Sequence, residues 1–260
     1  MSLIAAVDIG ASSGRVLTAH LDNDVPTTRE IRRFRNGPTP LGSRWIWPIQ
    51  DLLDEVKRGL AESANLGART FGIDTWAVDY AVIEASGTQM GPVYAHRDTH
   101  HWRGVEKVRN QITWAEQYRV TGIQDISINT IYQLAGEDPS RVLAGNRMLL
   151  VPDFFIYHLT GVIGAEVTNA STTGLMDPRT RKWAHEILEP LNIPATFLPD
   201  LHEPGQLIGR SRAEGTEQLS AISVATHDTA SAFAGTPIVN RDDAIVISLG
   251  TWALVGYEAT

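Results

Sequence analysis

The sequence contains no cysteine. This absence excludes a disulfide framework, a zinc site built from thiolates and a thiol nucleophile. The sequence also has no excess of positive charge, because 22 Lys and Arg residues stand against 30 Asp and Glu, for a net charge of −8. Proteins bind DNA and RNA largely by neutralising phosphates with Lys and Arg, so this balance argues against nucleic acid as the main partner.

Long hydrophobic runs are missing as well. The first ten residues, MSLIAAVDIG, have no basic flank and only a short apolar stretch. We therefore expect no signal peptide, no membrane span or membrane partner, and a cytoplasmic location. The 260 residues are nevertheless 43% hydrophobic, which excludes disorder as the overall description and provides for the core of one large domain or two smaller ones.

Strand-like and helix-like patterns follow one another along the chain. Strands are predicted over residues 3–7, 15–21, 70–76 and 79–85, the last two as partners in one hairpin. Helices are predicted over residues 48–65, within 100–143, and over 153–160, 181–191 and 227–235. This order of strands, helices and further strands indicates an α/β domain and excludes a helix bundle or a β-sandwich.

Two segments at opposite ends of the chain share one pattern. Residues 4–12 and 244–252 each begin as an apolar strand, reach a polar residue and continue with a glycine and a nearby hydroxyl residue. From this echo we expect the start of a second, related domain close to the end of the chain. A chance similarity between two buried strands that end in glycine turns is the alternative that the pattern leaves open.

The turn at residues 8–15, Asp-Ile-Gly-Ala-Ser-Ser-Gly-Arg, has the chemistry of a phosphate cradle. Small residues let a ligand approach the backbone, successive N–H groups can form an anion nest, and the hydroxyls add donors. Asp8, at the end of the strand, can hold Mg²⁺ through water. A Walker A loop is excluded because no Gly-Lys-Ser/Thr ending follows. An ordinary glycine-rich hairpin turn with an acidic neighbour is the structural alternative.

Residues 226–232, Thr-His-Asp-Thr-Ala-Ser-Ala, place an aspartate at the start of a helix of small residues. Asp228 can act as a general base towards a sugar hydroxyl, and His227 can form a hydrogen bond with the same sugar. The alternative is that Asp228 only caps the helix. Asparagine caps about as well as aspartate but cannot accept a proton, so this substitution separates the two interpretations.

Two further clusters have weaker signals. Asp74, Trp76 and Asp79 combine two carboxylates with an indole, a set that suits a sugar ring but also an ordinary buried strand with polar ends. His96 and His100 are four residues apart, as some metal ligands are. We do not expect a metal there, because the sequence offers no confirming cluster of ligands.

Taken together and in order, these segments resemble the FGGY carbohydrate kinases. The resemblance covers essentially the whole chain, on residues 7–15, 72–80, 97–98, 121–124, 128–134, 152–154, 168–173, 227–232 and 248–252. It implies an α/β fold of the ribonuclease-H-like type found in the actin-like ATPase superfamily, with a mixed central sheet flanked by helices. It also implies transfer of the ATP γ-phosphate, with Mg²⁺, to a ketose hydroxyl. L-rhamnulose, giving L-rhamnulose 1-phosphate, is the first expectation, and a family member acting on fuculose, xylulose or glycerol is the alternative.

The resemblance also implies roles for individual residues. Asp228 becomes the general base, and the sugar site gains Ala77, through its backbone, together with Asp79, His227 and Thr229. The first phosphate loop consists of Ala11, Ser12, Ser13, Gly14 and Arg15, Thr251 lies on the second loop, and Asp8 supports the magnesium ion.

The sequence departs from the family pattern in two places. After Arg97-Asp98 the family usually continues with another arginine, whereas Thr99 follows here, which affects the identity of the sugar. Family members also carry a second domain of comparable size with the adenine site. We therefore expect residues 1–240 to form the sugar-kinase domain and 241–260 the first hairpin of a missing C-terminal nucleotide-binding domain. The isolated chain should then turn over poorly; a non-catalytic sugar-binding module is the alternative from another class.

Overall fold

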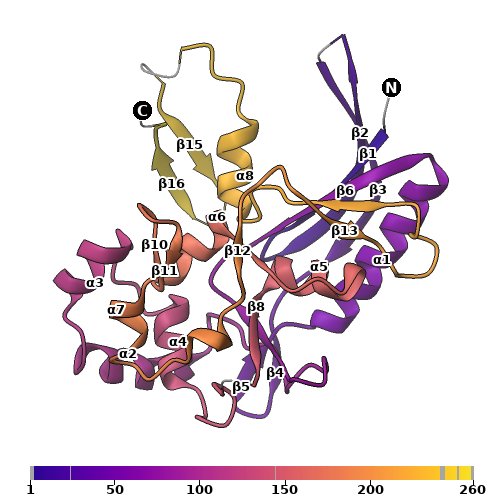
Figure 1. The fold of residues 1–260 in the computed structure, drawn as a ribbon. Coiled ribbons are helices and arrows are strands. Elements are labelled where there is room, and N and C mark those ends of the chain that lie inside the picture. Colours follow the sequence, from indigo (N-terminus) through magenta and orange to yellow (C-terminus); the bar gives the residue numbers. More distant parts are fainter. Residues whose placement is uncertain (1–2, 24, 144, 241–243, 251, 259–260) are drawn as a thin grey trace.

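A six-stranded mixed sheet is the centre of the larger of two lobes in the computed structural model, which describes residues 3–23, 25–143, 145–240, 244–250 and 252–258. The strand order is β13-β14-β6-β1-β2-β3 (Figure 1). The strands are β1 (Leu3–Ile9), β2 (Ser13–Asp22), β3 (Val25–Arg35), β6 (Ala68–Thr75), β13 (Leu207–Arg210) and β14 (Ser220–Ile222). Strands β1, β6 and β14 are parallel, and the other three pair antiparallel with their neighbours. The predicted mixed α/β sheet is confirmed.

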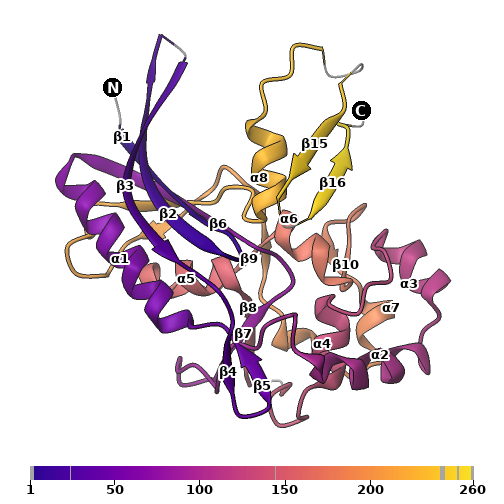
Figure 2. The same ribbon diagram turned by 180° about the vertical axis from the view of Figure 1, so that it is seen from behind.

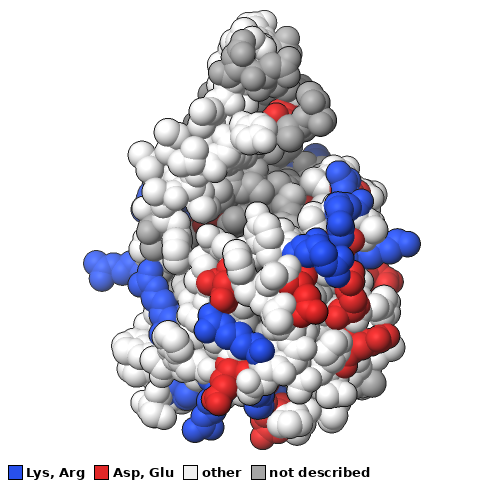
Figure 3. All heavy atoms as spheres, turned by 90° about the vertical axis from the view of Figure 1, so that its left-hand side faces the viewer, with Lys and Arg blue, Asp and Glu red and all other residues white. Residues whose placement is uncertain are grey.

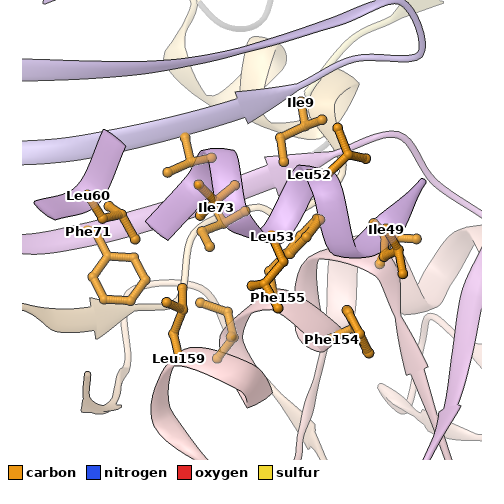
Figure 4. Packing of buried hydrophobic residues seen from close by; sticks show 14 of the residues in the cluster. Ile9, Ile49, Leu52, Leu53, Leu60, Phe71, Ile73, Phe154, Phe155 and Leu159 are labelled. Atoms are coloured by element: carbon orange, nitrogen blue, oxygen red, sulfur yellow. The ribbon is translucent and has the colours of Figure 1, made fainter. Parts of the chain in front are cut away.

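Helices α1 (Ile49–Asn65) and α5 (Val151–Thr160) pack against this sheet. In α1 the apolar side chains recur at helical spacing, so Leu52, Leu53 and Leu60 all face the core. Figure 4 shows them beside Phe71 of β6 and the side chains of α5. Complete burial of each such side chain contributes about 1.5–3 kcal/mol to folding, which fixes the sheet that carries the site.

The second lobe has its own hydrophobic core. It is formed around β7 (Tyr80–Ile83), β8 (Arg147–Leu150), α2 (Trp102–Arg109), α3 (Trp114–Thr121), α4 (Thr130–Gly136) and α7 (His185–Leu188). Helices α2 and α4 approach so closely that a Cβ atom on Gly104 would lie 1.7 Å from the carbonyl oxygen of Tyr132. Only glycine fits at this crossing.

The predicted hairpin of residues 70–76 and 79–85 is wrong. Strand β7 pairs antiparallel with β8 in a separate two-stranded sheet, and β6 pairs with β1 and β14. The chain turns sharply at Val78, which has a positive φ of 68°, and carries Tyr80 into the core of the second lobe. Strand β7 contributes to both cores, because Ala81 and Ile83 pack in the core of the central sheet whereas Tyr80 and Val82 pack in that of the second lobe. It therefore leaves the plane of the central sheet and pairs with β8.

The predicted helix over residues 181–191 is shorter than expected. Lys182 and Trp183 form β11 and pair with β10 (Met176–Asp177), and the amide of Ala184 donates to the carbonyl of Leu175. These bonds use the segment that would have formed the first helical turn, so only α7 remains helical. The small remaining elements are β4 (Thr39–Leu41), β5 (Arg44–Ile46), η1 (Thr99–His101), β9 (Ala165–Glu166), α6 (Val167–Ala170), η2 (Ser171–Thr173), η3 (Ala195–Phe197) and β12 (Leu201–His202).

Helix α8 (Asp228–Gly235) and the hairpin of β15 (Val246–Leu249) and β16 (Ala253–Gly256) project from the two lobes (Figures 1 and 2). Many of their apolar side chains are exposed, Leu249 to 78%, and Figure 3 shows mostly uncharged side chains on the described part of this projection. Both segments of the sequence echo are antiparallel hairpins, β1–β2 and β15–β16. The domain boundary near residue 241 stays a prediction. Among the described residues, no helix combines the length and apolar character needed to cross a membrane.

Candidate functional site

Three segments that are far apart in the sequence meet at the carboxyl ends of strands β1 and β6, which we call the edge of the central sheet. Asp8, near the end of β1, is the register partner of Asp74 near the end of β6. At the next position the amide of Thr75 donates to the carbonyl of Thr226 at 2.9 Å, and Thr75 forms a parallel bridge with His227. The fold therefore brings the glycine turn, the end of β6 and the start of α8 together.

Asp228 is the first residue of α8, and its side chain is 37% exposed. Its Oδ1 accepts from the Thr229 amide at 2.6 Å and the Thr229 hydroxyl at 3.2 Å, and His227 Nε2 lies 3.4 Å away. His227 occupies the N-cap position but makes no capping bond through its side chain, and the Asp228 carboxylate accepts from the Thr229 amide in the first turn, so its role as a general base stays a prediction. The carboxylate lies in the first turn, where the helix dipole favours negative charge, and a ligand can reach it.

His227 lies beside this carboxylate and is largely enclosed. Burial lowers the pKa of His227 below its ordinary value, although the charges of Asp228 and Glu166 act in the opposite direction. The imidazole is therefore neutral near pH 7. A neutral imidazole can both donate and accept a hydrogen bond, as a sugar hydroxyl requires.

Asp74 is a third carboxylate at this end of the sheet, and the sequence grouped it with Trp76 and Asp79 as a set that suits a sugar ring. Burial raises its pKa well above the ordinary value, and the charges of Asp8 and Asp228 raise it further. Asp74 is thus close enough to both Asp8 and Asp228 to interact with each of them electrostatically. Within the described residues, however, no group of three His, Asp or Glu side chains is arranged to hold a metal ion directly.

The predicted phosphate loop is a tight turn between β1 and β2. The amide of Gly10 donates to the carbonyl of Ser13 at 2.9 Å, and a Cβ atom on Gly14 would lie 2.2 Å from the ring of Phe34. Asn36, which sequence reasoning missed, braces the turn by donating its side-chain amide to the Gly10 carbonyl at 2.7 Å. Ala11 and Ser13 are half-buried, and Ser12 is exposed.

Arg15 extends from the same turn over the neighbouring strand. Its Nε and Nη2 donate to a single oxygen of Asp8, Oδ2, at 2.9 and 2.7 Å. Both side chains stay partly exposed. The turn therefore combines a cation and a carboxylate at the edge of the sheet. Thr251, predicted for the second phosphate loop, lies outside the described residues.

Asp79 differs from the expectation of direct contact with a sugar. Its side chain is 0% exposed, and Oδ2 accepts from Trp47 Nε1 at 2.6 Å, His96 Nδ1 at 2.8 Å and Trp76 Nε1 at 2.9 Å. Oδ1 accepts from Gln133 Nε2 at 3.1 Å. Four protein donors thus occupy the place where a ligand would have to bind. Ala77, two residues earlier, is half-buried.

Glu166 is a buried carboxylate that sequence reasoning also missed. Its Oε2 accepts from the amide of Thr226 at 2.9 Å and the hydroxyl of Thr226 at 3.0 Å, and its Oε1 accepts from the Thr168 amide at 2.8 Å. Thr226 is two residues before Asp228, so Glu166 anchors the segment that carries the predicted base. No local pattern marks this contact, because the two residues are 60 positions apart.

The fold and this end of the sheet define the class of the protein: a mixed α/β domain with a glycine turn and an accessible aspartate at a helix start close to the same strand ends. Within that class the chain belongs to the FGGY family of carbohydrate kinases, whose N-terminal domain matches residues 3–235.

Curated relatives agree with this assignment, and solved structures show the same fold. The chain is 39% identical to a rhamnulokinase from Enterococcus faecalis and 36% identical to one from Bacillus subtilis, in each case over 98% of this chain and 53% or 54% of the relative. The fold is similar to that of a carbohydrate kinase from Novosphingobium aromaticivorans, with a TM-score of 0.79 and 19% identity over 96% of this chain and 56% of the other. For a xylulose kinase from Rhodospirillum rubrum the TM-score is 0.77, with 16% identity over 95% of this chain and 53% of the other. The chain spans about half the length of the curated relatives it matches.

Proposed function

We propose that the chain is the sugar-binding part of an ATP-dependent kinase that converts L-rhamnulose to L-rhamnulose 1-phosphate. The observation that carries this proposal is the meeting of the glycine turn and the accessible Asp228 at one edge of the sheet. The identity of the sugar is supported by the 36% and 39% identity to two rhamnulokinases over nearly the whole chain.

In this reaction the Asp228 carboxylate accepts the proton of a sugar hydroxyl. The hydroxyl oxygen forms a bond to the γ-phosphorus, and the bond between that phosphorus and the bridging oxygen of ADP breaks. Such transfers depend mainly on positioning and charge stabilisation, with little covalent work for the protein. His227, Thr229 and the backbone of Ala77 would hold the sugar so that its hydroxyl lies within reach of Asp228.

The turn from Ala11 to Arg15 would receive the phosphates of ATP through its backbone N–H groups and hydroxyls. The donor set also fits Mg²⁺, because Asp8 offers a partly exposed carboxylate and Arg15 engages only its Oδ2. Mg²⁺ keeps several waters and takes one or two carboxylates, which agrees with the lack of a three-ligand cluster among the described residues. When bound, the ion would neutralise charge on the phosphates.

We further propose that residues 241–260 begin the nucleotide-binding domain. The family match covers residues 3–235, and the following hairpin exposes apolar side chains. With half of the phosphate clamp and the adenine site in that domain, the 260-residue chain alone should bind the ketose weakly and transfer phosphate very slowly.

The test is a panel of sugars incubated with Mg·ATP and the full gene product, with the phosphate ester detected by ³¹P NMR. We expect L-rhamnulose to be phosphorylated faster than fuculose, xylulose and glycerol. Faster turnover of any of these three would move the protein to another specificity within the family. No ester from any of them, with the protein folded, would contradict the kinase assignment.

A further inference from the structure

The chain makes a strained turn directly after β6. The amide of Asp79 donates to the carbonyl of Ala77 at 2.9 Å, and the residue between them, Val78, has a φ of 68°. An i to i+2 hydrogen bond around a positive φ is a γ-turn of the rare, strained kind. A β-branched residue is particularly unsuited to this region of φ, so the surrounding structure must impose the conformation.

Two sets of hydrogen bonds impose it. The carbonyl of Val78 accepts from the Thr130 hydroxyl at 2.7 Å and from Gln133 Nε2 at 3.2 Å, both on α4. The carboxylate of Asp79 accepts from Trp47, Trp76, His96 and Gln133. We call this four-donor arrangement the Asp79 hub. Because its donors come from segments of both lobes, the hub fixes the position of the turn relative to both lobes.

The turn lies at the same sheet edge as Asp228. Trp76 donates its amide to the carbonyl of Ile9 at 3.2 Å, and Thr75 is bonded to Thr226 and bridged to His227. Among the described residues, nothing accepts a hydrogen bond from the amide of Ala77 or Val78. Val78 is buried and Ala77 is half-buried, and backbone N–H groups removed from water are almost always paired, so these two donors are suited to an acceptor that comes from outside the protein.

We propose that Asp79 is a positioning residue that, through the Asp79 hub, holds the strained turn so that the Ala77 and Val78 amides receive an oxygen of the sugar. Asp79 itself does not touch the ligand. This inference rests on the proposed function, because it assigns the turn to the sugar side of the same site.

The experiment measures ketose affinity by isothermal titration of the 260-residue chain with L-rhamnulose. Asp79→Asn keeps the size of the side chain but replaces one acceptor oxygen with an N–H₂ group, which cannot accept from the hub. We expect the dissociation constant to rise by about tenfold or more.

Asp98→Asn is the matched control. The Asp98 carboxylate is nearly as buried, at 4% exposed, and accepts from Arg44, from the Trp45 amide and from the His100 amide, none of which belongs to the turn. Its dissociation constant should stay within about twofold of wild type.

A second substitution distinguishes a loss of the geometry of the turn from a general destabilisation of the protein. Glycine adopts a positive φ without steric cost, so Asp79→Asn combined with Val78→Gly should recover part of the lost affinity. If Asp79→Asn does not fold, Trp47→Phe removes one donor of the hub and should weaken binding to a smaller extent. Unchanged affinity in the folded hub variant, or an equal loss in Asp98→Asn, would overturn the inference. Failure of the wild-type chain to bind any ketose would instead count against the proposed function.

Discussion

The turn at residues 77–79 and the helix start at residues 227–229 lie next to each other but are built in opposite ways. Asp79 is completely enclosed and accepts from four side chains, three of which are distant in sequence. Asp228 is 37% exposed, and within the described part of the chain its carboxylate forms polar contacts with its two chain neighbours alone. A buried charge must be fully hydrogen-bonded to be tolerated, whereas an accessible carboxylate keeps its capacity for a ligand. The turn therefore provides a rigid backbone, and the helix start provides a carboxylate that can act on a ligand.

The largest predicted effect is a loss of turnover in the Asp228→Asn variant. The variant keeps the shape of the side chain but loses the proton acceptor. Turnover of the full gene product at saturating ketose should fall by about 10²–10⁴-fold, the usual contribution of a general base. Its urea midpoint should match that of wild type, since the residue makes no long-range bond. An initial rate near that of wild type would leave Asp228 without a catalytic role.

Asp79→Asn should give the opposite result in a stability measurement. Breaking a buried, hydrogen-bonded charge leaves its partners unpaired, and we expect a loss of about 3 kcal/mol in the free energy of unfolding. Urea denaturation followed by tryptophan fluorescence measures this loss, with Asp228→Asn as the matched control. Equal stabilities of the two variants would remove the contrast between the two regions.

Glu166→Gln tests whether the hydrogen bonds between Glu166 and Thr226 hold the start of α8 in place. The variant weakens the bonds to Thr226 and should lower the free energy of unfolding by about 1–3 kcal/mol. Turnover should also fall, because the segment before Asp228 loses its support. The control is Glu186→Gln, which removes an exposed ion pair with Arg119 and should change stability by less than about 1 kcal/mol. A Glu166→Gln protein with the stability and turnover of wild type would show that the anchor is dispensable.

The smallest expected effect is a pH dependence of the Asp79 hub. Burial alone would lower the pKa of His96, but the charge of Asp79 and the hydrogen bond to it outweigh burial, so the pKa is raised above 6.5. A histidine with a raised pKa in the folded state stabilises fully below pH 6.5, and this contribution is lost as the pH rises through the raised value. Arg97 opposes the shift, and the neighbouring His101 has a pKa lowered mainly by burial.

The measurement is the difference in unfolding free energy between wild type and His96→Asn, because the difference removes the contribution of other histidines. The advantage of wild type should be largest below pH 6.5 and should shrink above it. A difference that is constant, or that grows with pH, would mean that His96 is not held as an imidazolium by Asp79.

Local patterns in the sequence predicted the elements that pack through their own periodicity. Helices α1 and α8 and strands β1 and β2 are close to the expected positions. Strand β3 was not predicted, since it is an exposed edge strand in which Phe34 alone is fully buried. The pairing of β7 with β8 was also missed, because the pairing partner is more than 60 residues away.

The candidate site shows the same limit. The motif around Asp228 indicated an accessible carboxylate at a helix start, and this local feature is present. The enclosure of Asp79 could not be predicted, since three of its donors, Trp47, His96 and Gln133, are 17 to 54 positions away. Sequence reasoning identified the chemistry of both carboxylates, but only the packing distinguishes the one that is left open.

The most direct test of this account is a crystal structure of the chain with L-rhamnulose bound. The account predicts a sugar hydroxyl within hydrogen-bond distance of Asp228, about 2.6–3.2 Å, a second sugar oxygen at the Ala77 and Val78 amides, and an unchanged Asp79 hub. A sugar bound away from the carboxyl ends of β1 and β6, or one that reaches Asp79 by displacing Trp47 or His96, would contradict it.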